Sequence, residues 1–502
     1  MTDFIKENRL TLNRLLAWLG LQPQAADTAL SGIATDSRRV RSGDLFLALP
    51  GLASDGRDYI EAAAAQGAAA ILAEGGRELP EPGIPVVAVD NLHTQAGDLL
   101  DKAFGHPTGE VKVIGVTGTN GKSSTVHFLG CLLDKLSSGC GLMGTLGQGR
   151  VGELQDMGNT TADLLSTQRF MADMRDQKVG WVAMEVSSHG LDQGRTHGIS
   201  FDTAVFTNLT RDHLDYHGSM EAYAEAKALL FNRPGLKYAV INLDDEWAET
   251  IRSRVPASVQ CLAVSLENPS ADMYLENIQL HPQGMAADIV SPWGKGHLES
   301  GLLGRFNLSN LLGVIGVMGL QGFALDDVLK AVPSLTSVPG RMECFGGGDQ
   351  PTVAVDYAHT SDALKSVLSA LREHGGKNVI CVFGCGGDRD RGKRLLMAQA
   401  ACAGADKVVI TTDNPRSENP EAIIDDALSG LNGHQLEKVT VVVDRAQAIR
   451  QAITDASAGD VVLIAGKGHE TYQEIMGVRY PFSDVEEVRN VLSGVTLAGG
   501  EA

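Results

Sequence analysis

VKVIGVTGTNGKSS, at residues 111–124, is the stretch that decides the fold of this chain. Its first half is apolar and β-branched, which predicts a short buried strand. A glycine-rich turn follows, and the residues from Ser124 to about Leu136 have the pattern of a helix. A strand, a glycine turn and a helix in this order bring backbone N–H groups and the positive end of a helix to one point. Such a point suits a phosphate group.

The turn also carries two side chains suited to a nucleotide. Lys122 can reach the outer phosphates, and the Ser123 hydroxyl can bind Mg²⁺. The general P-loop pattern has glycine five positions before Gly121, whereas this chain has Val116 there. The apolar strand before the turn and the helix after it are the context that favours phosphate binding over a chance turn.

Composition narrows the class of function. The chain has 502 residues and a net charge of −20, so a nucleic acid partner is not expected. The N-terminus has no basic region followed by an apolar one, and no run approaches the roughly 20 apolar residues that span a bilayer. The seven cysteines are scattered without a zinc-site spacing, which is typical of reduced thiols. We therefore expect a cytoplasmic protein without a membrane partner.

Glycine and proline positions divide the chain into three segments, as its length also suggests. The first, residues 1–107, has the pattern of a small α/β domain, and Gly105–Glu110 is expected to be a linker. The second, residues 108–337, opens with the phosphate loop and ends near the Pro339–Gly340 pair.

The third segment, residues 338–502, alternates strand and helix patterns. Five strands are predicted in it: 352–356, 378–383, 407–412, 439–443 and 460–465. Alternation of this kind predicts a doubly wound, mostly parallel sheet, and the predicted fold class of the whole chain is α/β.

Polar residues follow two predicted strands of the second segment. Trp181–Val186 brings Glu185 to the end of a strand, where a carboxylate is well placed to hold Mg²⁺. Ala204–Thr207 leads into a loop rich in carboxylates and imidazoles, including His213. The helix that follows carries Lys227, which taken alone has the pattern of a surface charge.

Two loops of the third segment stand at strand ends, where ligands bind in open α/β sheets. They are GCGGDRDRGKR at residues 384–394 and DNPR at residues 413–416. Their charges are equally typical of salt-bridged surface loops, and the residues alone leave both interpretations open.

Together these motifs resemble the Mur ligase family, ATP-dependent amide-bond ligases that build the peptide of bacterial cell walls. The similarity covers almost the full chain and is strongest to the branch that adds meso-diaminopimelate as the third amino acid. It rests on TDSR at 35–38, TGTNGKSS at 117–124, NTT at 159–161, EVSSHGLDQGR at 185–195, TNLTRDHLDYHG at 207–218, the helix with Lys227, FNLSN at 306–310, VDYAHT at 355–360, GCGGDRD at 384–390, DNPR at 413–416 and AGKGHE at 465–470. One departure is Ser123–Ser124, where threonines are common in the family; the hydroxyl is retained.

The resemblance implies three domains. Residues 1–107 should bind the uridine nucleotide, residues 108–337 should form a central P-loop ATPase-type domain, and residues 338–502 should form a Rossmann-like domain that binds the amino acid. The implied substrates are UDP-MurNAc-L-Ala-D-Glu, meso-diaminopimelate and ATP, with Mg²⁺ as cofactor and a monomer as the expected state.

The resemblance also assigns residues to the two larger substrates. ATP should be held by Gly118, Thr119, Asn120, Gly121, Lys122, Ser123, Ser124, Asn307, Arg341 and Asp356. The UDP-linked dipeptide should be held by Thr35, Ser37, Asn159, Thr160, Thr161, Ser187, Gln193 and Arg195.

It assigns the amino-acid site and the metal site in the same way. Diaminopimelate should be held by Arg389, Asp413, Asn414, Pro415, Arg416, Gly466 and Glu470. Metal ligands should come from Ser123, Glu185, His213 and Lys227, and the catalytic set is Lys122, Lys227, His213 and Glu185. In this family the lysine at the position of Lys227 is carboxylated by CO₂ (N6-carboxylysine). That change explains how it can serve a metal, since an ammonium has no lone pair to offer.

Alternatives remain. A lysine-adding ligase of the same family is disfavoured because Arg416 can pair with the far carboxylate of diaminopimelate, which lysine lacks. A folylpolyglutamate synthase shares the ATP fold but has no uridine-nucleotide domain. A non-catalytic nucleotide-binding scaffold could lose Glu185, His213 or Lys227, yet all three are present.

Overall fold

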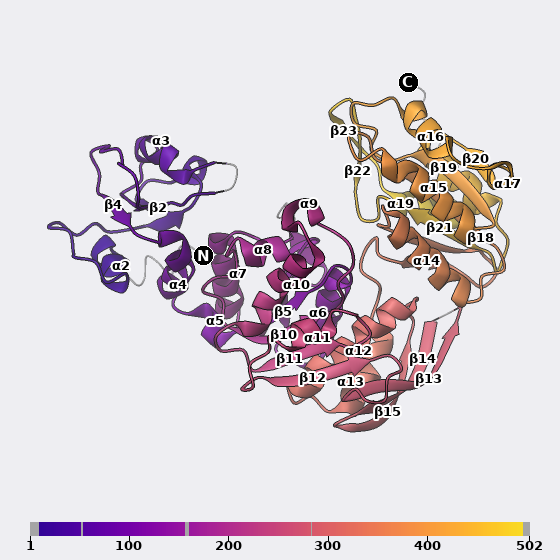
Figure 1. The fold of residues 1–502 in the computed structure, drawn as a ribbon, viewed down its shortest axis with the longest axis horizontal. Coiled ribbons are helices and arrows are strands. Elements are labelled where there is room, and N and C mark those ends of the chain that lie inside the picture. The colour runs from indigo at the N-terminus through magenta and orange to yellow at the C-terminus, as the bar shows by residue number, and fades with distance from the viewer. Residues whose placement is uncertain (1–9, 52–53, 156–159, 283, 495–502) are drawn as a thin grey trace. The chain divides into compact units, whose positions relative to one another are not determined.

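The computed structural model describes residues 10–51, 54–155, 160–282 and 284–494 (Figure 1). The chain forms two compact units, and each is described by itself. The first comprises Met1–Tyr274, Ser291–Trp293 and Asn310–Val328, and the second comprises Leu275–Val290, Gly294–Ser309 and Leu329–Ala502.

The first unit begins with a four-stranded parallel sheet in the order β1-β2-β3-β4. Its strands are β1 (Gly32–Ala34), β2 (Asp44–Ala48), β3 (Ala70–Glu74) and β4 (Val86–Val89). Alternate residues face opposite sides: Leu45 and Leu47 pack with α2 (Leu12–Trp18) and α4 (Leu92–Ala103), and Phe46 packs with α3 (Ile60–Ala65). The small α/β pattern predicted here is confirmed.

A larger sheet follows, and the strand of the opening motif lies at its centre. From β12 to β8 the strand order of this sheet is β12-β11-β10-β5-β9-β6-β7-β8, and β5 (Lys112–Thr117) pairs in parallel with both β10 (Phe201–Phe206) and β9 (Trp181–Glu185). The remaining strands are β6 (Cys140–Gly144), β7 (Gly147–Arg150), β8 (Glu153–Gln155), β11 (Tyr238–Asn242) and β12 (Gln260–Ser265). Because parallel strands end at one edge, the loops after β5, β9 and β10 open on the same side.

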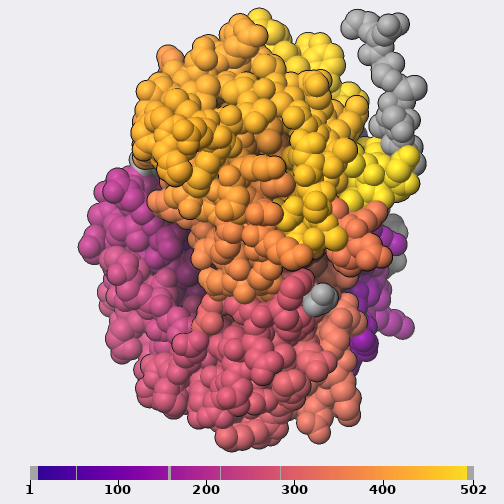
Figure 2. All heavy atoms as spheres, turned by 90° about the vertical axis from the view of Figure 1, so that its right-hand side faces the viewer, coloured from indigo at the N-terminus to yellow at the C-terminus, as the bar shows by residue number. Residues whose placement is uncertain are grey.

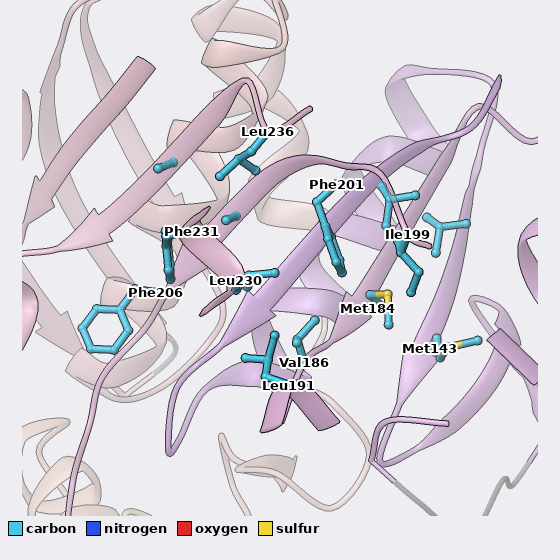
Figure 3. Close-up of a cluster of buried hydrophobic side chains, with 14 of the residues drawn as sticks. Met143, Met184, Val186, Leu191, Ile199, Phe201, Phe206, Leu230, Phe231 and Leu236 are labelled. Carbon is cyan, nitrogen blue, oxygen red and sulfur yellow. The ribbon is translucent and has the colours of Figure 1, made fainter. Parts of the chain in front are cut away.

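Helices follow both the phosphate loop and the later polar loops, and they pack on this sheet. α6 (Lys122–Leu136) begins two residues earlier than predicted, directly after the glycine turn. The other helices are α7 (Leu164–Asp176), α8 (Ser188–Asp192), α9 (Leu214–His217), α10 (Met220–Ala228) with η3 (Leu229–Asn232), and α11 (Ala248–Arg252). Figure 3 shows part of their shared core, where Phe206 of the sheet lies beside Phe231 of η3, and Met184 and Leu191 belong to the same cluster.

One predicted linker has regular structure. Pro107–Glu110, within the expected linker, forms the short helix α5, with Pro107 at its first position and buried. Proline lacks only an N–H that a helix start leaves unpaired anyway, so it can open a helix as well as break one. The linker prediction is therefore wrong for these four residues.

In the sequence between β12 and β16 lie elements that the sequence analysis describes only in part. They are β13 (Met273–His281), β14 (Gly284–Ser291), β15 (Gly294–Ser300), α12 (Arg305–Leu320), α13 (Leu325–Ala331) and η4 (Val332–Ser334). The apolar helix expected after Gly304 is α12, whereas no prediction covers β13 to β15.

The second unit contains a six-stranded sheet in the order β16-β17-β21-β18-β19-β20, in which only β16 is antiparallel. The strands are β16 (Glu343–Gly346), β17 (Thr352–Asp356), β18 (Val379–Cys385), β19 (Lys407–Thr412), β20 (Val439–Val441) and β21 (Val461–Ala465). A separate antiparallel hairpin is formed by β22 (Tyr472–Ile475) and β23 (Val478–Pro481).

Helices cover both faces of this sheet, as the doubly wound prediction requires. One face packs on α14 (Ser361–Glu373), α15 (Gly392–Gly404) and α16 (Pro420–Leu428). The other packs on α18 (Arg445–Thr454) and α19 (Asp484–Leu492), while α17 (Gly433–Leu436) is a single turn. In the space-filling view the residues of this sheet and its helices are orange to yellow (Figure 2). The predicted α/β class is confirmed.

A fully buried ion pair joins α18 to α19 behind the sheet. Arg445 donates from Nε and Nη2 to the two carboxylate oxygens of Asp484, at 2.8 and 2.7 Å, and neither side chain is exposed. Nη2 of Arg445 also donates to the Ala465 carbonyl at the end of β21. The pair therefore fixes two helices and one strand end with a single guanidinium.

We expect Asp484→Ala to lower the free energy of unfolding by about 3–5 kcal/mol, because it leaves a buried guanidinium unpaired. Urea denaturation, with hydrogen exchange of β19 and β21 as the local probe, measures this. The matched control is Asp362→Asn, which removes an ion pair to Lys365 whose side chains are both mostly exposed. If Asp484→Ala shifts the midpoint no more than Asp362→Asn, the pair does not stabilise the unit.

Candidate active site

The glycine turn after β5 is held against the loop after β10. Gly118 and Gly121 have φ of 152° and 83°, in the region that favours glycine, and a Cβ at Gly118 would collide with Oγ1 of Thr207. The Asn120 N–H donates to Oδ1 of Asn208 at 2.9 Å, and the Asn120 carbonyl accepts from Thr207 at 2.6 Å. The turn is thus shaped before any ligand binds.

Two amines converge on one backbone oxygen of this turn. Lys122 donates from Nζ to the carbonyls of Gly118 and Thr119, at 2.8 Å each, and Lys227 donates from α10 to the same Gly118 oxygen at 2.8 Å. Lys227 is 1% exposed and lies over the Tyr223 ring, 4.4 Å from its centroid. The surface-charge interpretation of Lys227 is therefore wrong.

This environment disfavours a charged Lys227. Burial lowers its pKa well below the usual value, and the nearby Lys122 lowers it further, while Asp212 acts weakly in the opposite direction. A buried amine without its proton has a free lone pair. The site can therefore present a nucleophilic nitrogen beside a phosphate loop.

A chain of oxygen atoms links the phosphate loop to the predicted peptide side. Oγ of Ser123 donates to Oε1 of Glu185 at 2.8 Å, and Glu185 is buried at the end of β9. Thr145 donates to the same carboxylate from its backbone N–H at 2.9 Å and from its hydroxyl at 3.2 Å. The Thr145 hydroxyl also lies 3.1 Å from that of Thr160. Predicted residues for ATP, metal and dipeptide thus meet at Glu185.

The donor set around Glu185 fits Mg²⁺, which prefers carboxylate, hydroxyl and water oxygens and completes its shell with substrate phosphates. Within the described part of the chain, no three His, Cys, Asp or Glu side chains come together as a metal cage. An ion here would need oxygen atoms from its substrates, as Mg²⁺ sites at phosphates usually do.

His213 lies in a group of aromatic rings near Lys227. Its ring centroid is 4.9 Å from that of His189 and 6.1 Å from that of Tyr223, the ring beneath Lys227. His217 stacks on Tyr223 at 5.0 Å, and its Nε2 is 2.9 Å from Oγ of Ser188. His213 has a φ of 52°, so the loop turns sharply there and half exposes its ring.

The predicted dipeptide residues that follow β9 also come together. Ser187 caps α8 by accepting from the Gly190 N–H at 3.0 Å, and Thr161 lies 3.0 Å from the Ser187 hydroxyl. Arg195 donates to the Thr161 carbonyl at 3.1 Å and to Oε1 of Gln193. These contacts order a polar surface beside Glu185.

The remaining residues assigned to this substrate lie elsewhere. Thr35 and Ser37 lie between β1 and β2, where Ser37 is buried as the first residue of a 3-10 turn. Arg169 of α7 donates to the Ile33 carbonyl just before them, which ties this segment to the central sheet. Asn159 lies outside the described residues.

The residues predicted for the adenosine end belong to the second unit. Asp356, at the end of β17, is buried and accepts from the backbone N–H groups of Met342 and Ala358 at 2.8 Å each. Burial raises its pKa, while Arg341 opposes that shift. The Arg341 guanidinium lies over the Tyr357 ring at 4.8 Å. Asn307, also buried, donates to the Leu303 carbonyl at 2.9 Å.

Several residues predicted for the amino-acid site, among them Asp413 and Gly466, lie where β19 and β21 end. Gly466 has a φ of 118°, and a Cβ there would lie 2.7 Å from Oδ2 of Asp413. Burial raises the pKa of Asp413, and Arg445 and Lys467 oppose that shift. The Gly466 N–H donates to the Asp356 carbonyl at 3.1 Å. The residues predicted for the adenosine end and those predicted for the amino acid therefore lie at the same edge of the sheet.

The arginine of DNPR is fixed by its backbone. Arg416 has a φ of 51°, and its Nη1 donates to the Gly387 carbonyl at 2.7 Å. The carbonyl of Asn414, before Pro415, accepts from the Gly387 N–H at 2.9 Å, so DNPR and the 384–394 loop are joined at the backbone. Arg389 of that loop is exposed. The two loops therefore form one joined structure. The salt bridges expected in the alternative interpretation are also present, because Arg394 pairs with Glu418 and Asp426.

Sequence reasoning missed three residues of these clusters. Thr145 follows β6 in a stretch without a motif, and Tyr223 is an aromatic residue within a helix pattern. Lys467 stands inside the quoted AGKGHE motif, but nothing in the sequence indicates that its side chain is fully buried. Only the last had a signal that could have been followed, because it is flanked by two assigned positions.

Comparison with known proteins places these clusters in a family. Sequence models match three successive stretches: the Mur ligase family catalytic domain at residues 29–103, the Mur ligase middle domain at 116–318, and the Mur ligase glutamate ligase domain at 340–468. A protein of Pseudomonas aeruginosa named UDP-N-acetylmuramoyl-L-alanyl-D-glutamate–2,6-diaminopimelate ligase is 49% identical over 96% of this chain and 98% of its own length. The chain belongs to the Mur ligase family. The resemblance inferred from the motifs is confirmed.

Other Mur ligases extend the comparison. A relative of the same name from Coxiella burnetii is 44% identical over 93% of this chain and 96% of its own length. A solved structure of a ligase with that name superposes with a TM-score of 0.74 at 39% identity, covering 97% of this chain and 99% of that one. MurF of Thermotoga maritima in complex with ADP has a TM-score of 0.61 at 21% identity, over 92% of this chain and 97% of that one, which shows a shared fold.

The comparisons also bear on the folylpolyglutamate synthase alternative. A folylpolyglutamate synthase of Mycobacterium tuberculosis has a TM-score of 0.59 at 20% identity and covers 73% of this chain and 91% of its own, so it shares the fold alone. Within the described ranges, no helix of this Mur ligase is both long and apolar enough to cross a bilayer. All seven cysteines are free thiols, as predicted.

The lowered pKa of Lys227 predicts a pH dependence of stability. The pKa of Lys227 in the folded protein lies below 10.5, the value taken for the unfolded chain. At a pH between these two pKa values the unfolded chain binds one more proton than the folded protein. The free energy of unfolding therefore rises with pH in this range. We expect Lys227→Met to flatten this rise in buffer purged of CO₂, measured by urea midpoints between about pH 7 and pH 10. Lys407→Met, at an exposed position of β19, is the control. Equal slopes for all three proteins would contradict a neutral Lys227.

Proposed function

We propose that this chain joins 2,6-diaminopimelate to the D-glutamate side-chain carboxylate of UDP-MurNAc-L-Ala-D-Glu, with ATP converted to ADP and phosphate. The observation that carries the proposal is similarity at 44–49% identity, over more than nine-tenths of the chain, to ligases named for these substrates. The clusters around Glu185 and Asp413 supply the chemistry that such a reaction needs.

The first step activates a poor acyl donor. The γ-phosphoryl group moves from ATP to a carboxylate oxygen, so that one P–O bond forms, the bond to the β-phosphate oxygen breaks, and ADP leaves. Two anions must approach each other, and Lys122 with the N–H groups of residues 118–124 offsets their repulsion. Mg²⁺, held by Ser123 and Glu185 together with phosphate oxygens, would neutralise further charge on the transferring group.

The second step forms the amide. The amine of the incoming amino acid attacks the acyl carbon, the C–N bond forms, phosphate leaves with the oxygen it gained, and a proton passes to solvent. No side-chain nucleophile is required. Thr161, Ser187, Gln193 and Arg195 would orient the peptide, and Thr160 joins that surface to Glu185 through Thr145. Asn159 would also bind this substrate, and Thr35 and Ser37 would hold the uridine end.

Carboxylation of Lys227 follows from its surroundings. A neutral Nζ can attack CO₂, which forms a carbamate and releases one proton. The product places an anion beside Lys122 where the neutral amine had no charge, so the two side chains then attract each other. N6-carboxylysine also offers oxygen atoms to a second Mg²⁺, for which His213 would be the neighbouring ligand.

The acceptor is read at its far end. Arg416 would pair with the far carboxylate of meso-diaminopimelate, assisted by Arg389 and Asn414, while Glu470 and the Gly466 carbonyl would receive the far ammonium. Asp413 and Pro415 of the same loop would also contact the acceptor. Lysine lacks the far carboxylate, so binding it would leave a guanidinium without its partner.

The wider assignments follow the same proposal. Residues 1–107 bind the uridine nucleotide, residues 108–337 bind ATP through the glycine turn, and residues 338–502 bind the amino acid. Asn307, Arg341 and Asp356 hold the adenosine end. The protein acts as a cytoplasmic monomer on small molecules, without a nucleic acid or membrane partner.

Phosphate release tests the function directly. With ATP, Mg²⁺ and UDP-MurNAc-L-Ala-D-Glu, we expect sustained release with meso-diaminopimelate, at least about tenfold slower release with lysine, and only background without acceptor. Equal rates with lysine would favour the lysine-adding alternative. Background rates with every acceptor would favour a nucleotide-binding scaffold and would contradict the proposal.

A further inference from the structure

We propose that Lys467, together with strand β22, positions the acceptor-reading side chains and sets the discrimination between diaminopimelate and lysine. The inference rests on the proposed function. Lys467 is a positioning residue, because its amine contacts Asn414 and Glu470 and is fully buried behind them.

Three side chains form a closed triangle of hydrogen bonds. Nζ of Lys467 donates to Oδ1 of Asn414 at 3.0 Å and to Oε2 of Glu470 at 2.8 Å. Nδ2 of Asn414 donates to the same Oε2 of Glu470 at 2.8 Å. Each corner fixes the other two, so neither acceptor-reading side chain can rotate alone. Oε1 of Glu470 and the second N–H of Asn414 take no part in the triangle, so these two groups are left for the acceptor.

Strand β22 holds the same motif through the backbone. The Glu474 N–H donates to Oδ1 of Asn414 at 2.9 Å, and the Gln473 side chain donates to the Asp413 carbonyl at 2.7 Å. Arg416 pairs with β22 in parallel: its N–H donates to the Glu474 carbonyl at 3.0 Å, and its carbonyl accepts from Met476 at 2.7 Å. The left-handed turn at Arg416 is thus held from both sides.

Oδ1 of Asn414 accepts from two donors, and only one orientation of the amide allows this. If the amide were reversed, its NH₂ group would face the Lys467 ammonium and the Glu474 N–H, which are both donors. Lys467 therefore dictates that Asn414 presents an N–H to the ligand. An N–H attracts a carboxylate and repels an ammonium. At this position the site therefore favours an acceptor whose far end carries a carboxylate, as diaminopimelate does and lysine does not.

The charge of Lys467 distinguishes between the two acceptors. Meso-diaminopimelate carries two ammonium and two carboxylate groups, whereas lysine has one carboxylate fewer and a net positive charge. A buried cation close to Glu470 raises the potential at the far end of the acceptor and so disfavours the more positive ligand. Removing that cation should harm diaminopimelate binding and at the same time make lysine relatively more acceptable.

The test compares kcat/KM for both acceptors in wild type and Lys467→Met. We expect the KM for diaminopimelate to rise about tenfold or more, as for the loss of hydrogen bonds to a charged group, with the KM for ATP nearly unchanged. The ratio of kcat/KM for diaminopimelate to that for lysine should fall by about tenfold. A merely structural defect would lower both acceptors together and leave this ratio constant.

Two further variants keep the result interpretable. Gln473→Leu removes only the side-chain bond to the Asp413 carbonyl, and we expect a smaller rise in the KM for diaminopimelate; it also serves if Lys467→Met does not fold. Lys407→Met makes the same charge change at an exposed position and should behave as wild type. An unchanged acceptor ratio in Lys467→Met, or an unchanged KM in Gln473→Leu, overturns the positioning role. If wild type itself does not use diaminopimelate, the proposed function fails instead.

Discussion

The carbonyl oxygen of Gly118 receives hydrogen bonds from two amines, and much of the active-site structure depends on that arrangement. One amine, Lys122, begins the helix after the phosphate loop, and the other, Lys227, comes from α10 and is buried against Tyr223. Two ammonium groups at one oxygen repel each other, and burial increases that repulsion. The fold therefore favours a Lys227 without its proton, and an amine in that state can take up CO₂.

A second buried network also contains two cations, but there each cation is paired with a carboxylate. Around Asp413 the buried cations Arg445 and Lys467 are matched by carboxylates, Asp484 and Glu470. Charges of both signs are held in fixed positions by several hydrogen bonds each, as buried ions require. The first site keeps one amine neutral, so that CO₂ can convert it to an anion, whereas the second site matches each cation with a carboxylate of the chain. The first suits phosphoryl transfer, and the second suits recognition of a zwitterion.

The sequence predicted the elements that depend on local patterns. The strand, turn and helix at residues 111–136, the parallel C-terminal sheet and the doubly wound arrangement have clear periodicities, and all are present. What the sequence could not predict depends on tertiary packing. The burial of Lys227 and Lys467 could not be predicted, because lysine in a helix or loop pattern is expected at the surface. Thr145 is equally hidden, since its role arises only where β6 ends beside β9. Pro107 was assigned to a linker because the rule that proline breaks helices has an exception at their first position.

Carboxylation of Lys227 is the central claim that one measurement addresses most directly. The full-length protein is equilibrated with ¹³C-labelled bicarbonate, and its ¹³C NMR spectrum is recorded beside that of Lys227→Met. The account predicts a carbamate carbon resonance in wild type that disappears in Lys227→Met and when CO₂ is removed. A wild-type spectrum without that resonance, or the same resonance in both proteins, would contradict it.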